Sequence, residues 1–238
     1  GILYLSSNIK SRVENVNIQI VDYAKELAIN SERFKTIEEF VRIPAEDMAE
    51  GFTPDIIGYS MMFSTCHPIF NEAVTAHKKI WPDSIVIAGG NHATNAADVL
   101  MDHPDVDYVA RGECELAFPE FIRNLDSHKD TVVQGFYNRE HVLNKLPTSL
   151  APYIQDLDEL VFPDWELLDM ESYVNTRTGR ARKRTEENAD RREISIMTNR
   201  GCPFSCTFCA AHTTMGKSMR FRSIDNVIAE MKELNERY

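Results

Sequence analysis

Three cysteines near the end of the chain, Cys202, Cys206 and Cys209, have the residue type and the spacing to do chemistry. They lie in the run Arg-Gly-Cys-Pro-Phe-Ser-Cys-Thr-Phe-Cys, which ends at Cys209. Thiolates this close together can hold a metal ion or an iron–sulfur cluster, but a site with four ligands needs a fourth, and this run supplies none. A [4Fe–4S] cluster held by only three cysteines keeps one iron open for a substrate or cofactor. The cysteines therefore indicate a catalytic centre.

A structural zinc site is the alternative interpretation of the same cysteines. Its fourth ligand would be His212, the one histidine close to the run in the sequence. Gly201 and Pro203 favour a tight turn, and the spacing of three and then two residues lets the three thiolates converge on one face of a cluster. We favour the cluster over zinc.

Composition argues against nucleic-acid and membrane partners. The 238 residues carry a formal net charge of -11, whereas phosphate binding favours clustered Lys and Arg. A basic stretch at residues 177–192 is interrupted by Glu186, Glu187 and Asp190, so we interpret it as a solvated linker. No apolar run approaches the roughly 18 residues that a membrane span needs. Three of the five cysteines are crowded together, which does not suggest a disulfide framework, so we expect a cytoplasmic protein.

Residues 1–125 alternate between helical and strand patterns. Helices are predicted at residues 1–12, 37–49, 70–80, 96–101 and 114–125, and strands at residues 16–21, 55–59, 85–88 and 106–110. Short strands that alternate with helices predict a parallel sheet covered on both faces, which is an open α/β fold. Such a domain normally begins with a strand, and we expect that strand to lie ahead of Gly1.

The remainder of the chain has two parts. Residues 126–193 are rich in polar residues with scattered Pro and Gly, and they predict a connector with a small hairpin that includes a strand at residues 131–137. A strand at residues 193–198, the cysteine run and a helix at residues 224–237 then form one β-loop-α unit, with Ser223 as the helix cap. Loops that follow strands carry the catalytic groups of (β/α) barrels.

The cysteine run resembles the radical S-adenosylmethionine superfamily. The match is Cys-x-x-x-Cys-x-aromatic-Cys, with Phe208 as the aromatic residue, followed by Met-Arg-Phe-Arg-Ser at residues 219–223. The resemblance implies that Cys202, Cys206 and Cys209 ligate a [4Fe–4S] cluster, with Phe208 at the S-adenosylmethionine site. It also implies that one electron, from an external donor such as flavodoxin or ferredoxin, cleaves S-adenosylmethionine to methionine and a 5'-deoxyadenosyl radical. Protein groups then place and shield that radical.

Small polar residues follow three of the predicted strands. Ligands of an open α/β sheet bind beyond the carboxyl ends of its strands. Small residues there let the tail of a large planar ligand approach the backbone, although ordinary tight turns in a flavodoxin-like domain would look the same. The residues at these ends are Ser60, Ser64 and Thr65, then Gly89, Gly90, Asn91, His92, Ala93 and Thr94, then Gly112, Glu113, Cys114 and Glu115.

Residues 85–115 resemble the cobalamin-binding domain that precedes many radical S-adenosylmethionine barrels. Ser60-x-Met62, followed after residues 63–88 by Gly89-Gly90, is similar to two elements of cobalamin domains. Two departures are visible: Cys114 replaces the second glycine of Gly-Glu-Gly-Glu, and no Asp-x-His-x-x-Gly motif is present, which leaves a histidine ligand below cobalt unsupported. The resemblance implies that cobalamin is bound by Ser60, Ser64, Thr65, Gly89, Gly90, His92, Ala93, Thr94, Gly112 and Glu113.

Three further residues are interpreted as structural. His67 is expected to be a hydrogen-bonding loop residue. Cys66 and Cys114 are expected to be small buried residues, because two cysteines are too few for a second cluster. This also disfavours the tRNA methylthiotransferase relatives, whose amino-terminal domain is associated with a three-cysteine cluster site.

We therefore expect a cobalamin-dependent radical S-adenosylmethionine enzyme that acts on a small molecule. Its parts would be a cobalamin-binding α/β domain at residues 1–125, a connector at residues 126–193, and the first βα unit of a radical S-adenosylmethionine barrel at residues 194–238. The favoured reaction is methyl transfer to an unactivated carbon. The alternatives are oxidative ring closure, as in the anaerobic Mg-protoporphyrin ester cyclases, and a non-catalytic cobalamin or iron–sulfur module. We expect this chain to be an inactive fragment, because most of the barrel that binds the substrate would lie outside it.

Overall fold

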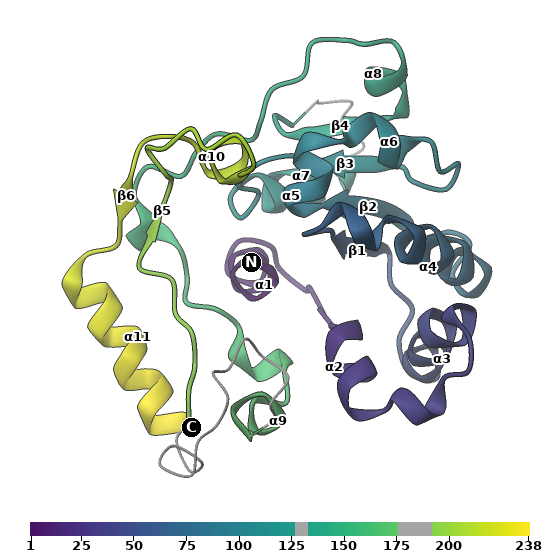
Figure 1. Ribbon diagram of the computed structural model, residues 1–238, viewed down its shortest axis with the longest axis horizontal. Coiled ribbons are helices and arrows are strands. Elements are labelled where there is room, and N and C mark those ends of the chain that lie inside the picture. The colour runs from purple at the N-terminus through teal and green to yellow at the C-terminus, as the bar shows by residue number, and fades with distance from the viewer. Residues whose placement is uncertain (127–132, 176–191) are drawn as a thin grey trace.

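The computed structural model describes residues 1–126, 133–175 and 192–238 (Figure 1). Its described strands form a four-stranded sheet in the order β1-β2-β3-β4 and a two-stranded sheet of β5 and β6. The strands are β1 (Ile56–Ser60), β2 (Ile85–Gly89), β3 (Tyr108–Ala110), β4 (Phe136–Asn138), β5 (Asn199–Arg200) and β6 (Arg220–Phe221). The α-helices are α1 (Ile2–Lys10), α2 (Tyr23–Ile29), α3 (Ile37–Ala49), α4 (His67–Ile80), α5 (Gly90–Asn95), α6 (Ala97–Met101), α7 (Ala117–Asp126), α8 (Arg139–Leu143), α9 (Met170–Asn175), α10 (Ala211–Met215) and α11 (Ile224–Arg237).

The first sheet confirms the predicted open α/β fold. Strands β1, β2 and β3 run parallel, and each parallel pair is joined by a helical crossover. Neighbouring residues of a strand point to opposite faces of the sheet. Val86 therefore packs in one core with Val74 of α4 and Leu100 of α6, whereas Ile87 packs in a second core with α1 and α7. Helices thus cover both faces of the sheet, as Figure 1 shows.

Most predicted elements of the α/β part are present with shifted ends. The helix at residues 37–49 is confirmed without change, and Thr36 caps it by accepting a hydrogen bond from the Glu39 N–H. The predicted helix at residues 114–125 begins later, at Ala117, because the residues before it form a loop whose carboxylates are used in ion pairs. Helices α2 and α5 were not predicted, since each is short and α5 contains a Gly-rich sequence that is typical of a turn.

The predicted strand at residues 16–21 is wrong. Its alternating pattern does bury part of Val16 and Ile18 against the core, but this segment belongs to neither described sheet. The predicted strand at residues 193–198 is also wrong, because residues 193–198 pair with no strand among the described residues and pairing with β6 begins at Asn199. An apolar alternation reports which side chains are buried, whereas a strand also needs a neighbour to accept its backbone hydrogen bonds.

The connector region joins the first sheet. Strand β4 pairs antiparallel with β3, with Phe136 opposite Ala110, so the end of the predicted strand at residues 131–137 is confirmed as part of this sheet and not as a separate hairpin. The first residues of that prediction, and the basic stretch at residues 177–191, lie outside the described residues. No helix of the described residues is long and apolar enough to cross a membrane.

Helix α11 follows the sequence prediction closely. It runs from Ile224 to Arg237, and the Ser223 hydroxyl accepts a hydrogen bond from the Asn226 N–H, which confirms the predicted cap. Figure 1 shows that α11 continues from β6, at the opposite end of the picture from α3 and α4. The segment from β5 to α11 contains the cysteines, but β5 and β6 form an antiparallel pair of two residues each, and its assignment as the first βα unit of a barrel stays a prediction.

Candidate functional site

The turns after β1 and β2 are locked to each other through the backbone. Ser60 and Gly89 are the last paired residues of these parallel strands. Beyond them, the Met61 N–H donates to the Gly89 carbonyl at 2.8 Å, and the His92 N–H donates to the Met61 carbonyl at 2.8 Å. Gly90 has φ of +90°, and a Cβ there would lie 2.8 Å from the Met61 carbonyl oxygen. Only glycine fits this position, so no side chain covers the backbone of the glycine-rich turn (residues 89–94) at Gly90.

His92 brings an unpaired polar atom to this glycine-rich turn. Its side chain is only 9% exposed, and its Nδ1 lies 3.0 Å from the Ser64 hydroxyl. Its buried Nε2 has no hydrogen-bond partner among the described residues, and neither has the Nδ1 of neighbouring His67. Burial, and then the nearby His67, lower the pKa of His92. A buried, neutral imidazole with a free nitrogen fits a polar group of a bound molecule, because buried polar atoms are nearly always paired.

Most of the other residues predicted at the strand ends fall into two groups, and Gly89 and Gly112 are intermediate in exposure. Ser60, Ser64, Thr65 and Gly90 are exposed, whereas Ala93 and Thr94 are buried. The Thr94 hydroxyl donates to the Gly90 carbonyl at 2.9 Å and accepts from the Gly112 N–H at 3.0 Å. Thr94 therefore ties the glycine-rich turn to the loop after β3. The exposed group is available to a ligand, and the buried group supports the backbone beneath it.

The cysteine loop (residues 201–219) connects β5 to β6. Its two ends lie against each other where they leave these strands, and we call this part of the loop its neck. Gly201 has φ of +93°, and a Cβ there would clash with the Ser218 carbonyl oxygen. The Cys202 N–H donates to the Gly216 carbonyl at 3.0 Å, and Lys217 donates to the Ser205 hydroxyl at 2.9 Å. These contacts hold the two sides of the loop together near the cysteines.

The cysteines themselves fit the ligand set of a cluster. Cys202 and Cys209 are half-buried, and Cys206 is exposed. The Ala211 N–H is directed at the Cys209 sulfur at 3.5 Å, which is the type of hydrogen bond that tunes cluster sulfurs. Phe208, next to Cys209, is 91% exposed, so its ring is free to contact a bound molecule.

The three thiols are not arranged around a single metal ion. In the described ranges, no three His, Cys, Asp or Glu side chains lie close enough together to share one. A [4Fe–4S] cluster does not require this, because each cysteine binds a different iron. The predicted convergence of the thiolates on a cluster stays a prediction. His212, the zinc alternative's fourth ligand, lies on α10.

The cysteine loop contacts the glycine-rich turn directly. Helix α10, within the loop, lies beside α5, as Figure 1 shows. The Thr214 hydroxyl of α10 donates a 2.6 Å hydrogen bond to the Asn91 side-chain oxygen of α5. The two segments that sequence analysis singled out for chemistry therefore meet in the folded chain, although they are more than 100 residues apart.

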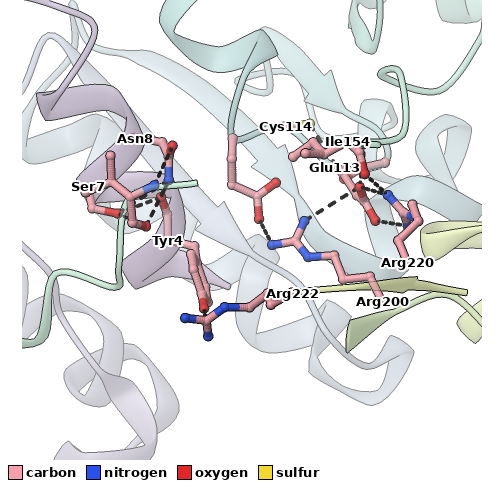
Figure 2. A network of polar contacts seen from close by, with 12 residues as sticks. Tyr4, Ser7, Asn8, Glu113, Cys114, Ile154, Arg200, Arg220 and Arg222 are labelled. Atoms are coloured by element: carbon pink, nitrogen blue, oxygen red, sulfur yellow. Dashed lines mark hydrogen bonds and ion pairs between the residues drawn. The ribbon is translucent and has the colours of Figure 1, made fainter. Parts of the chain in front are cut away.

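A buried group of ion pairs joins both ends of the cysteine loop to the loop after β3, and sequence analysis did not anticipate it. Arg220 donates to both carboxylate oxygens of Glu113, and Arg200 donates to Glu115 (Figure 2). Glu113 was predicted to contact cobalamin, but in the structure both of its oxygens accept hydrogen bonds from Arg220. The available signal was the pair of acidic residues in Gly-Glu-Cys-Glu and the arginines around the cysteines. Local spacing does not reveal that these groups pair.

The two remaining cysteines differ in their surroundings. Cys66 is exposed, so the expectation that it is buried is wrong. It lies in a one-turn 3-10 helix at residues 64–66, which projects from the end of β1. Cys114 is partly buried, and burial, with the nearby charges of Glu115 and Glu113, raises the pKa of its thiol.

Comparisons with known proteins show which proteins this chain is similar to. Residues 10–122 match the family model described as the B12 binding domain. An uncharacterized methyltransferase of Pyrococcus horikoshii is 30% identical over 100% of this chain and 46% of its own length. The anaerobic magnesium-protoporphyrin IX monomethyl ester cyclase of Synechocystis is 31% identical over 65% of this chain and 28% of its own length. The cobalamin-dependent radical SAM methyltransferase TokK of Streptomyces tokunonensis is 31% identical over 71% of this chain and 24% of its own length.

The fold is also similar to a solved structure. The radical S-adenosylmethionine methyltransferase TsrM of Kitasatospora setae superposes with a TM-score of 0.60 at 14% identity, over 98% of this chain and 42% of that chain. The likeness therefore extends across both the sheet and the cysteine loop. This chain spans less than half the length of the curated relatives named above.

Proposed function

Because the chain belongs to the family that joins a B12 binding domain to a radical S-adenosylmethionine unit, we propose that it forms the cofactor-binding part of a cobalamin-dependent radical S-adenosylmethionine methyltransferase. The cluster supplies, when bound and reduced, the electron that cleaves S-adenosylmethionine to methionine and a 5'-deoxyadenosyl radical. The favoured outcome is transfer of a methyl group to an unactivated carbon of a small-molecule substrate.

One observation carries this proposal: the glycine-rich turn and the cysteine loop touch. The Thr214 to Asn91 hydrogen bond and the packing of α10 beside α5 bring the two segments together, which supports the proposal that the two cofactor sites are adjacent. A protein that used cobalamin and a cluster separately would not need them adjacent. Methyl transfer and radical formation on one substrate do need this, because reacting groups must be held close together.

Each cofactor has its own proposed residues. Cys202, Cys206 and Cys209 hold the cluster, and the exposed Phe208 ring packs against S-adenosylmethionine. The exposed Ser60, Ser64, Thr65 and Gly90 lie at the strand ends, where the corrinoid tail is proposed to bind, with His92 beneath them. Gly89, Ala93, Thr94 and Gly112 are proposed to shape the backbone of that site.

The cobalamin site is proposed without a histidine ligand to cobalt. His92 is buried and is held by the Ser64 hydroxyl, which fixes its ring beneath the glycine-rich turn. Its free Nε2 is suited to hydrogen bond with a polar group of the corrinoid tail. An external one-electron donor, such as a flavodoxin or ferredoxin, is proposed to reach the exposed face of the cysteine loop around Cys206.

The proposal is tested on the full-length protein after anaerobic reconstitution with iron, sulfide and hydroxocobalamin. The cluster's electron paramagnetic resonance spectrum is expected to change when S-adenosylmethionine is added. Reduction is then expected to yield 5'-deoxyadenosine, and methyl transfer is expected to yield S-adenosylhomocysteine as well. An unchanged spectrum together with no 5'-deoxyadenosine would overturn the radical chemistry.

A second candidate function is oxidative ring closure. It is favoured by the 31% identity to the anaerobic magnesium-protoporphyrin IX monomethyl ester cyclase of Synechocystis. The same reconstituted protein separates the two candidates, because a cyclase forms 5'-deoxyadenosine without S-adenosylhomocysteine. A protein that binds corrinoid and cluster but forms neither product would instead be a non-catalytic module.

A further inference from the structure

Both ends of the cysteine loop carry an arginine. Arg200 is the last residue of β5 and Arg220 is the first residue of β6, and the two are directly opposite each other in the antiparallel pair. Directly opposite residues of an antiparallel pair point to the same face. The two guanidinium groups therefore project together from the neck of the loop that holds the cysteines.

Two carboxylates from the loop after β3 receive these arginines. Arg220 binds Glu113 through two hydrogen bonds of 2.7 and 2.6 Å, and Arg200 donates to Glu115 at 2.6 Å. Arg200 also lies 3.7 Å from a Glu113 oxygen, so Glu113 contacts both arginines. Figure 2 shows the Glu113 side chain between them. The loop after β3 thus binds the arginines on both sides of the neck.

Backbone groups also bind Glu113 and Arg220. The Ile154 N–H donates to a Glu113 oxygen at 3.0 Å, and Arg220 donates to the carbonyls of Ile154 and Met215 at 2.6 Å each. Glu113 and Arg220 are 5% and 7% exposed. Both carboxylate oxygens of Glu113 and both terminal nitrogens of Arg220 therefore have partners inside the protein, and such pairing is what allows a buried ion pair to be tolerated.

The two arginines need the two carboxylates as counter-charges. Two arginines opposite each other would repel across a two-residue strand pair, and so short a pair is unstable by itself. Removal of either carboxylate would leave a buried guanidinium without its counter-charge.

We propose that Glu113 and Glu115 are positioning residues that clamp both ends of the cysteine loop to the loop after β3, which Thr94 in turn ties to the glycine-rich turn. The functional consequence of this clamp rests on the proposed function, because the position of the cysteine loop would set how the cluster lies relative to the cobalamin site. The clamp itself is a property of the folded chain. Glu113 acts here through Arg200 and Arg220 and not as a cobalamin ligand.

Hydrogen–deuterium exchange of the protein without any cofactor tests the clamp. In Glu113→Gln, backbone exchange in residues 201–219 is expected to become at least about tenfold faster, while β1 and β2 keep their protection. Unchanged exchange in residues 201–219 would overturn the proposal. Equal acceleration in every segment would also overturn it, because that result indicates general destabilisation.

The matched control is Glu230→Gln. Glu230 is also a buried carboxylate paired with an arginine, Arg222, but it lies on α11 and is not part of the clamp. This control is expected to accelerate exchange in α11 and to leave residues 201–219 as in the wild type. If Glu113→Gln does not fold, Arg220→Lys keeps the charge and loses the two-pronged contact, and it is expected to show the same local acceleration.

A titration with hydroxocobalamin separates this inference from the proposed function. Glu113→Gln is expected to bind hydroxocobalamin with a dissociation constant within about twofold of the wild type, a change too small to reflect a lost direct contact. A tenfold or larger loss would make Glu113 part of the corrinoid site and would overturn its role as a positioning residue. Failure of the wild type to bind hydroxocobalamin would contradict the proposed function, and the exchange measurement would still decide the clamp.

Discussion

The Thr214 hydroxyl donates a 2.6 Å hydrogen bond to the side-chain oxygen of Asn91, although the two residues are 123 positions apart. Thr214 lies on the helix that follows the cysteines, and Asn91 lies in the glycine-rich turn after β2. The Glu113 clamp joins the cysteine loop to a different segment, the loop after β3. The cysteine loop is thus held at its neck by charge and at its helix by a neutral hydrogen bond.

We expect the Thr214 to Asn91 bond to be worth about 0.5–1.5 kcal/mol. A double-mutant cycle with Thr214→Val and Asn91→Ala measures it as the difference between the double variant's unfolding free energy and the sum of the single effects. The control pairs Asn91→Ala with Thr213→Val, because the Thr213 hydroxyl bonds the Ala210 carbonyl within its own segment. That pair should be additive. Additive behaviour of Thr214→Val and Asn91→Ala would show that the contact is not made in solution.

Each of Cys202→Ser, Cys206→Ser and Cys209→Ser is expected to lose most of the iron and sulfide bound after anaerobic reconstitution. A serine oxygen is a poor substitute for a thiolate ligand of a cluster. Cys66→Ser is the control, because Cys66 is exposed but lies after β1 and outside the cysteine loop. Iron and sulfide contents measure the outcome. Equal losses in Cys66→Ser would assign the metal to a different ligand set.

Gly90→Ala is expected to destabilise the protein by more than about 1 kcal/mol and to weaken corrinoid binding. The new Cβ would lie 2.8 Å from the Met61 carbonyl oxygen, and φ of +90° is strained for any residue with a side chain. Gly58→Ala in β1 is the matched control, because a Cβ added at Gly58 would meet no atom within 4 Å. Chemical denaturation and a hydroxocobalamin titration report the two effects. Identical behaviour of the two variants would contradict the tight approach of the two turns.

Stability is expected to fall as the pH is lowered through the range in which His77 titrates. His77 bonds the Tyr59 hydroxyl at 2.6 Å and the Val41 carbonyl at 3.0 Å, and its pKa is lowered because burial outweighs the hydrogen bond to Val41. Below about pH 6.5 the unfolded chain binds a proton that the folded chain resists, so unfolding becomes more favourable. The contribution is fully present above that pH and is lost as the pH falls toward the folded pKa.

Denaturation of the wild type and His77→Gln between about pH 5 and pH 8 measures this effect. Glutamine does not titrate, so His77→Gln is expected to be less stable at the alkaline end of this range but to show a flatter decline toward the acidic end. Parallel pH profiles in the two proteins would mean that His77 is not the group responsible.

Local patterns in the sequence determined much of the secondary structure of this protein. The spacing of the cysteines, the glycines after β2 and the apolar periodicity of α3 and α11 each depend on residues within a few turns of one another. For that reason the helix at residues 37–49 and the cap at Ser223 could be predicted to the residue. The same patterns also singled out the cysteine loop and the glycine-rich turn as candidate cofactor-binding segments, which stays a prediction.

Only the tertiary structure decided which of those segments meet. The alternating residues 16–21 have the pattern of a strand but are paired with no neighbour in either described sheet, and β4 was found to join β3. The pairing of Glu113 with Arg220 joins residues 107 positions apart, so no local pattern encodes it. Spacing along the chain fixes what a loop can bind, whereas the fold fixes which loops lie together, because long-range contacts form only when distant segments share one core.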